Sequence, residues 1–167
     1  MGVFRFKQFN IRQDNTAMKI GTDGTLLGAW VDVKGAENIL DIGTGTGVIA
    51  LMTAQRNLET KVTAIEINDD AVIDATFNIK ESPWADRVEL KETSLQDFKT
   101  EGKYDVIVSN PPFFENSLRS NSANRNNARH TDSLHYSDIL KFAEIHLTTG
   151  GVLAMILPVE NAEKCID

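Results

Sequence analysis

This chain of 167 residues contains one cysteine and no long apolar run, and basic residues are outnumbered by acidic ones. The single cysteine, Cys165, cannot form an internal disulfide, which fits a reducing, cytoplasmic compartment. No apolar stretch approaches the roughly 18 to 20 residues that span a bilayer, and the N-terminus lacks the apolar centre of a signal peptide. A net charge of -7 argues against a protein that coats nucleic acid by charge alone. We therefore expect a cytoplasmic enzyme or binding domain without a membrane partner.

The positive charge that is present gathers in two segments. Residues 4–12, FRFKQFNIR, interleave Arg5, Lys7 and Arg12 with phenylalanines. Residues 117–130, SLRSNSANRNNARH, carry arginines among many asparagines. A solvated strand and a loop explain either segment taken alone, so neither identifies a partner.

Short apolar runs alternate with helical patterns from residue 38 onward. The apolar runs predict five strands, at residues 38–43, 61–67, 87–93, 104–110 and 151–158. The helical patterns predict helices at residues 22–32, 46–57, 68–82 and 134–147. The last helix is expected to close at Gly150 and Gly151, because glycine commonly ends a helix.

Continuous rather than alternating hydrophobicity is typical of strands that are buried on both faces. Strands of this kind, joined by helices, predict an α/β fold with a Rossmann-like, doubly wound, mostly parallel sheet. We expect residues 1–167 to form a single domain, with residues 1–32 as an N-terminal cap segment and residues 33–167 as the core. Ligands in such sheets bind at the carboxyl ends of the strands.

A glycine-rich turn follows the first strand of that core, within LDIGTGTGVIAL at residues 40–51. The turn consists of Gly43, Thr44, Gly45, Thr46 and Gly47. Its glycines let the backbone approach a ligand, and the following helix offers free N–H groups. Glu66 ends the next strand about 20 residues later, where a carboxylate accepts hydrogen bonds from a ribose. NAD and other adenosine cofactors both fit this pattern, and a purely structural turn remains an alternative.

Other features distinguish between these cofactors. Asp41, directly before the glycines, suits a ligand with an ammonium or sulfonium centre better than a pyrophosphate. Asp97, which follows the third strand, is placed to accept a hydrogen bond from an adenine amino group. The fourth strand ends in NPPFF at residues 110–114, where neither proline can donate a ladder hydrogen bond.

These motifs carry a resemblance to a known family. KIGTDGTLLGAWV at residues 19–31, the glycine turn and NPPFF resemble class I S-adenosylmethionine-dependent methyltransferases of the amino-methylating NPP[FY] type. The bacterial tRNA(Val) adenine-37 N6-methyltransferases are the most similar, from about residue 4 to the end of the chain. The resemblance implies S-adenosylmethionine as cofactor and the anticodon loop of a tRNA as substrate. We also expect a monomer without a metal ion.

The NPPFF motif at the end of the fourth predicted strand can be explained by the chemistry of amine methylation. An exocyclic adenine amine is a poor nucleophile because its lone pair is delocalised into the ring. The side-chain oxygen of Asn110 and the Pro111 carbonyl can accept hydrogen bonds from its two N–H groups, which frees that lone pair. Pro111 and Pro112 make the turn rigid, and Phe113 is expected to stack on the base. Phe114 fits a core role and a base contact equally well.

The resemblance also implies that Thr22 and Asp23 lie by the methionine end of the cofactor, although Thr22 alone would serve as a helix N-cap. The expected cofactor-binding residues are Thr22, Asp23, Asp41, Gly43, Thr44, Gly45, Gly47, Glu66, Asp97 and Asn110. The three histidines lack metal-ligand spacing. Because the protein is acidic, we expect RNA to contact the two basic segments.

One departure concerns the C-terminus. The family places two more strands after the fifth, whereas this sequence ends at PVENAEKCID, so an uncovered strand edge and a truncated core are expected. Alternative functions are a protein-glutamine N5-methyltransferase, an rRNA guanine N2-methyltransferase and a cofactor-binding scaffold that truncation has inactivated. A dehydrogenase is the least favoured.

Overall fold

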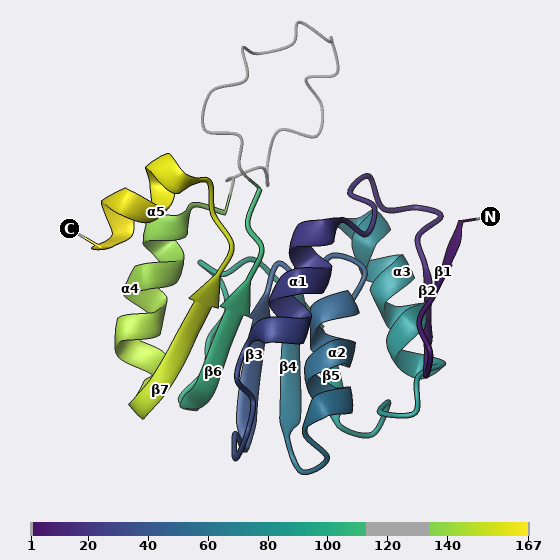
Figure 1. Ribbon diagram of the computed structural model, residues 1–167, viewed down its shortest axis with the longest axis horizontal. Coiled ribbons are helices and arrows are strands. Elements are labelled where there is room, and N and C mark those ends of the chain that lie inside the picture. Colours follow the sequence, from purple (N-terminus) through teal and green to yellow (C-terminus); the bar gives the residue numbers. More distant parts are fainter. Residues whose placement is uncertain (1, 113–133, 167) are drawn as a thin grey trace, which may run out of the picture.

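The central sheet contains five strands, in the order β5-β4-β3-β6-β7, in a computed structural model that describes residues 2–112 and 134–166. The strands are β3 (Asn38–Ile42), β4 (Lys61–Glu66), β5 (Val88–Glu92), β6 (Tyr104–Ser109) and β7 (Leu147–Met155). All neighbouring pairs in this sheet are parallel. Figure 1 shows the strands side by side with their carboxyl ends at one edge. The prediction of a Rossmann-like parallel sheet is therefore confirmed.

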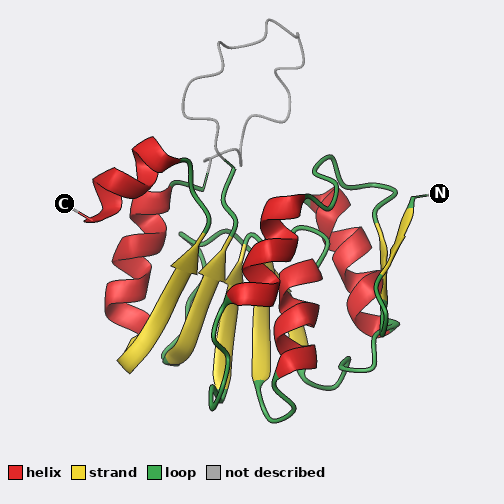
Figure 2. Ribbon diagram, in the orientation of Figure 1, coloured by secondary structure: helices red, strands yellow, loops and turns green. Residues whose placement is uncertain are grey.

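Helices pack on both faces of the sheet, as the ribbon in Figure 2 shows. They are α1 (Thr22–Trp30), α2 (Val48–Arg56), α3 (Asp69–Lys80) and α4 (Tyr136–His146), whereas α5 (Val159–Ile166) follows β7 beyond the carboxyl end of the sheet. One buried cluster joins α1, α2 and α3 to the sheet, and a second joins α4 to its other face. Adjacent residues of β3 divide between the clusters, Ile39 into the first and Leu40 into the second. This division explains why adjacent residues of the strand, such as Ile39 and Leu40, are both apolar. No helix in the described ranges is both long and apolar enough to cross a membrane.

The order in which successive strands are added to the sheet reverses at β3, which pairs with β4 on one side and with β6 on the other. In the register of these pairs, Ile42 lies opposite Ile65 and opposite Ser109. The glycine turn, Glu66 and Asn110 each follow one of these residues. The fold therefore brings the three sequence motifs to one edge at the switch point, where parallel sheets bind ligands.

The N-terminal segment forms a hairpin and a helix. Strands β1 (Val3–Arg5) and β2 (Asn10–Arg12) pair in antiparallel fashion, and β2 packs against α3. Helix α1 packs against α2, as Figure 1 also shows. The predicted helix is confirmed, although its N-cap is Gly21, so Thr22 is not the capping residue.

The expected closure of the last predicted helix at Gly150 and Gly151 is wrong. Helix α4 ends at His146, and β7 begins at the next residue. Both glycines lie inside β7, where the pairing with β6 changes register after Tyr104. Gly150 has a φ of 83°, a conformation that glycine adopts readily. These glycines thus serve a strand irregularity rather than a helix end.

Candidate active site

A cavity of about 410 Å³ opens at the carboxyl ends of the central strands. Its walls come from the glycine turn, from the ends of β4, β5 and β6, and from the N-terminal segment. The lining residues are Thr16, Ala17, Met18, Ile42, Gly43, Gly45, Ile65, Glu66, Ile67, Asn68, Ala71, Thr93, Ser94, Leu95, Gln96, Asn110, Pro112 and Leu134. Five predicted site residues line this cavity: Gly43, Gly45, Glu66, Asn110 and Pro112.

The glycine turn owes its shape to left-handed backbone conformations. Gly43, Gly45 and Gly47 have φ values of 68°, 58° and 82°, which other residues adopt at a cost. The N–H groups of Gly43 and Thr44 each donate to the Ile65 carbonyl at 3.0 Å. These bonds tie the turn to β4 and hold its backbone at the cavity wall.

Glu66 joins the glycine turn to the start of α3. Its Oε2 accepts a hydrogen bond from the Gly45 N–H at 2.8 Å. Its Oε1 accepts from the N–H groups of Ile67 and Asn68, both at 2.9 Å. A carboxylate offers about four acceptor positions, so one on Oε2 remains for a ligand hydroxyl. This arrangement fits the predicted ribose contact.

Asp41 is fully buried beneath the turn and does not line the cavity. Its Oδ2 accepts hydrogen bonds from the Thr44 hydroxyl at 2.5 Å and from the Ala50 N–H at 3.0 Å. Ala50 lies in the first turn of α2, whose N-cap, Gly47, has no side chain to offer. Asp41 therefore caps α2 from a neighbouring strand, and its predicted contact with a cationic ligand stays a prediction.

The burial of Asp41 has an electrostatic consequence. Loss of hydration disfavours the carboxylate, and it outweighs the hydrogen bonds from Thr44 and Ala50, so the pKa of Asp41 rises to about 7. The negative charge of Glu66 acts in the same direction. Within the described ranges, Oδ1 of Asp41 has no hydrogen-bond partner.

Asn110 follows β6 and presents an unpartnered oxygen. Its Oδ1 is buried and makes no hydrogen bond to any residue that the structure describes. Beside its Nδ2 lies Gly24 of α1, where an added Cβ would stand 3.6 Å away. Pro111 is buried and Pro112 is exposed at the cavity wall, whereas Phe113 and Phe114 lie outside the described residues. An unsatisfied buried acceptor is costly, so Asn110 is suited to receive a donor from a ligand.

Six predicted cofactor contacts are not among the residues that line the cavity: Thr22, Asp23, Asp41, Thr44, Gly47 and Asp97. The carboxylate of Asp97 accepts a hydrogen bond from the Ser94 hydroxyl at 2.8 Å. The Asp97 N–H donates to the same hydroxyl oxygen at 3.0 Å. Asp97 thus closes the turn after β5, and neighbouring residues 94–96 face the cavity.

Residues 16–18 contribute a wall that was not predicted from the sequence. Thr16 is buried, and Met18 is 54% exposed. The sequence of this segment has no helical or strand periodicity. The buried face of α3, however, carries polar residues that indicate a partner segment. Asp74 and Asn78 are polar residues four positions apart, alongside the apolar positions Ala75 and Ile79, and both are buried. Polar side chains on a buried helix face indicate a specific partner.

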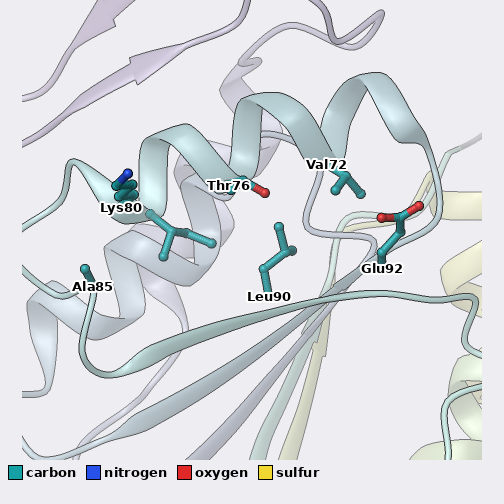
Figure 3. Close-up of a pocket in the computed structure, with 7 residues that line it drawn as sticks. Val72, Thr76, Lys80, Ala85, Leu90 and Glu92 are labelled. Atoms are coloured by element: carbon teal, nitrogen blue, oxygen red, sulfur yellow. The ribbon is translucent and has the colours of Figure 1, made fainter.

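A second hollow, also of about 410 Å³, lies between α3 and β5. Figure 3 shows Leu90 pointing from β5 toward α3, with Val72 and Thr76 on the helix and Glu92 nearby. None of the glycine-turn residues lines this hollow. The described part of the chain also contains no cluster of histidine, cysteine and acidic residues that could hold a metal ion. The first cavity is therefore the candidate site.

The chain is similar in sequence to known methyltransferases. The family model described as the methyltransferase small domain matches residues 17–162. A protein of Trichodesmium erythraeum named tRNA1(Val) (adenine(37)-N6)-methyltransferase is 56% identical over 165 residues, which cover 96% of this chain and 69% of that protein. A protein of the same name from Phocaeicola vulgatus is 49% identical, with 96% and 68% covered.

Solved structures support the fold. A precorrin-6y C5,15-methyltransferase from Geobacter metallireducens aligns with a TM-score of 0.63 at 16% identity, covering 90% of this chain and 72% of that one. A ribosomal protein L11 methylase from Lactobacillus delbrueckii aligns with a TM-score of 0.60 at 22% identity, covering 86% and 62%. At these identities the likeness concerns the fold alone.

Proposed function

The chain belongs to the methyltransferase small domain family, in the group of tRNA1(Val) (adenine(37)-N6)-methyltransferases, and we propose that it methylates N6 of an adenine in a tRNA anticodon loop. S-adenosylmethionine is the proposed methyl donor. The observation that carries the proposal is the buried, unpartnered Oδ1 of Asn110 in the same cavity as the glycine turn and Glu66.

The residues of the cavity fit S-adenosylmethionine. Its volume of about 410 Å³ lies in the usual range for small-molecule sites. Gly45 presents open backbone, since an added Cβ there would meet no atom within 4 Å, and Glu66 keeps an acceptor position for the ribose hydroxyls. When bound, S-adenosylmethionine supplies an electrophilic methyl group on its sulfonium. We assign the remaining cofactor contacts to Thr22, Asp23 and Asp97, while Asp41, Thr44 and Gly47 shape the turn.

Asn110 and Pro111 orient and activate the target amine in this proposal. The Asn110 Oδ1 and the Pro111 carbonyl accept hydrogen bonds from the two N–H groups of the adenine amine, which draws its lone pair out of the ring system. Rigid prolines fix these acceptors before the base arrives. Phe113 stacks on the extruded adenine, a contact worth about 1–3 kcal/mol. Orientation for transfer, rather than a strong base, supplies the rate.

We further propose that the protein acts as a monomer in the cytoplasm, without a metal ion. RNA recognition through a single unstacked base suits an anticodon loop, whose bases are accessible without opening a duplex. The two basic segments, residues 4–12 and 117–130, are the proposed contacts for the RNA backbone, because the protein as a whole is acidic.

The reaction is tested with methyl-labelled S-adenosylmethionine and unmodified tRNA, followed by digestion to nucleosides. We expect label in N6-methyladenosine. Label in N2-methylguanosine would overturn the adenine assignment, and label in a protein glutamine would overturn the RNA assignment. Preferential binding of NADH over S-adenosylhomocysteine would contradict the proposal that S-adenosylmethionine is the cofactor.

A further inference from the structure

Two buried polar side chains of α3, Asp74 and Asn78, hold the segment at residues 12–18, here called the N-terminal strap. Neither side chain lines the cavity. The strap does, through Thr16, Ala17 and Met18. The wall of the cavity is thus connected to helix side chains that lie behind it.

Asn78 is 1% exposed and links the strap to the glycine turn. Its Oδ1 accepts a hydrogen bond from the Arg12 N–H at 2.7 Å, and its Nδ2 donates to the Arg12 carbonyl at 2.8 Å. The same Nδ2 donates to the Thr46 carbonyl at 2.9 Å. One side chain therefore connects two segments that are far apart in sequence and that both carry cavity walls.

Asp74 is fully buried and accepts four hydrogen bonds from the strap. Its Oδ2 accepts from the N–H groups of Asn15 and Thr16, both at 2.9 Å. Its Oδ1 accepts from the Asn15 side-chain amide at 2.9 Å and from Arg12 Nε at 3.2 Å. Burial raises the pKa of Asp74, but the hydrogen bonds outweigh it and hold the pKa below its usual value.

The strap has further contacts that fix its course over α3. The Arg12 guanidinium lies 4.0 Å from the centre of the Phe77 ring, and its Nη2 donates to the Ile73 carbonyl at 3.4 Å. The Thr16 hydroxyl donates to the Met18 carbonyl at 3.3 Å. The bonds to Asp74 at Asn15 and Thr16 therefore hold the strap where it begins to line the cavity.

We propose that Asp74 and Asn78 are positioning residues for methyl transfer, which set cofactor affinity by fixing the strap as one wall of the cavity. This inference rests on the proposed function, because it assigns the cavity to the cofactor. A side chain that only stabilised the fold would lower the unfolding temperature without a specific change in cofactor affinity. Asp74 and Asn78 should change affinity in the folded protein.

The test compares Asp74→Asn and Asn78→Ala with two controls. Asp70→Asn removes an exposed carboxylate from the same helix, one turn before Asp74. Val106→Ala removes buried methyl groups from β6 without touching strap or cavity. Calorimetry measures the Kd of S-adenosylhomocysteine below each variant's unfolding temperature. The rate of hydrogen exchange at the Asn15 and Thr16 amides reports whether the strap remains hydrogen-bonded to α3.

We expect Asp74→Asn and Asn78→Ala to weaken binding at least tenfold, to raise the KM for S-adenosylmethionine more than they lower kcat, and to speed exchange at Asn15 and Thr16. Both controls should bind as the wild type does. If the wild type binds and both α3 variants bind equally well, the positioning role is wrong and the proposed function stands. If the wild type binds no S-adenosylhomocysteine, the proposed function fails and this inference fails with it.

A milder variant covers the case in which Asp74→Asn does not fold. Asn15→Ala removes one hydrogen bond to Asp74 from an exposed residue of the strap. We expect about a threefold loss of affinity with the fold intact, since the change removes one of several bonds. Unchanged affinity together with faster exchange at Thr16 would show that the strap moves without consequence for the cofactor, which contradicts the proposal.

Discussion

Glu66 and Glu92 occupy paired positions on neighbouring strands, yet only Glu66 lines the candidate site. The difference lies in what each carboxylate meets. Glu66 accepts three backbone N–H groups at the glycine turn and at the start of α3, whereas Glu92 is exposed beside the second hollow. The pair therefore offers a comparison between a carboxylate of the site and a matched one outside it.

We expect Glu66→Gln to weaken S-adenosylhomocysteine binding about tenfold or more. A hydrogen bond to a charged group contributes about 1.5–3 kcal/mol, and glutamine would direct an amide N–H toward the Gly45 N–H or the ribose. Calorimetry measures the change, with Glu92→Gln as control. Equal affinities in the two variants would remove Glu66 from the cofactor site.

Asp41 makes the stability of the protein depend on pH. Its pKa is raised from 3.8 to about 7 in the folded state, so the folded protein holds a proton that the unfolded chain releases between these values. This contribution to stability is complete below the unfolded pKa and is lost as pH rises through about 7. Asp41→Asn cannot titrate and lacks this dependence.

The expected result is a gap in unfolding free energy between the wild type and Asp41→Asn that changes by at most about 1.4 kcal/mol per pH unit in that interval, in favour of the variant as pH rises. Urea titrations at several pH values from about 4 to about 8 measure the gap. A constant gap would mean that Asp41 is already ionised in the folded protein at low pH.

At the scale of elements, the turns can be compared in the same way. Gly45 and Gly35 have φ values of 58° and 74°, and an added Cβ would meet no atom within 4 Å at either position. Only Gly45 lines the cavity. Their backbone conformations are alike, so the cost of alanine should be alike as well.

We expect Gly45→Ala and Gly35→Ala each to lower the free energy of unfolding by about 1–2 kcal/mol, the cost of a left-handed conformation. Gly45→Ala alone should weaken S-adenosylhomocysteine binding, since its methyl group would stand at the wall of the cavity proposed for the cofactor. Denaturation and calorimetry on both variants separate these effects. Normal binding by Gly45→Ala would contradict the assignment of this turn.

The elements themselves were largely predictable because their signals are local. The helix predicted at residues 68–82 corresponds to α3, whose N-cap, Asn68, accepts a hydrogen bond from the Ala71 N–H. The end of α4 was not predictable, because Gly150 and Gly151 signal a helix end as readily as a strand irregularity. The register of β7 against β6 decides between them, and pairing with a distant strand leaves no local pattern.

At the scale of the whole molecule, the sequence predicted which motifs meet but not what surrounds them. Parallel strands bring their carboxyl ends together, so Gly43, Glu66 and Asn110 could be placed in advance. The position of the strap at residues 12–18 could not be predicted, because it is held by hydrogen bonds to Asp74 and Asn78, which lie about 60 residues away in the sequence. Likewise Asp41 was expected to face the ligand, and only the packing of α2 reveals its capping role.

The most direct test of the central claim is a single-turnover methylation of unmodified tRNA by the wild type and by Asn110→Ala, at saturating S-adenosylmethionine. We predict N6-methyladenosine as the wild-type product. We also predict a rate at least about 100-fold lower in the variant, the loss typical of removing one positioned hydrogen-bonding group. Because Asn110 also lines the cavity proposed for the cofactor, the affinity of both proteins for S-adenosylhomocysteine is measured alongside, and saturating S-adenosylmethionine removes any difference in it from the rate. A variant that forms N6-methyladenosine at the wild-type rate would contradict the role of Asn110 and with it the proposed mechanism.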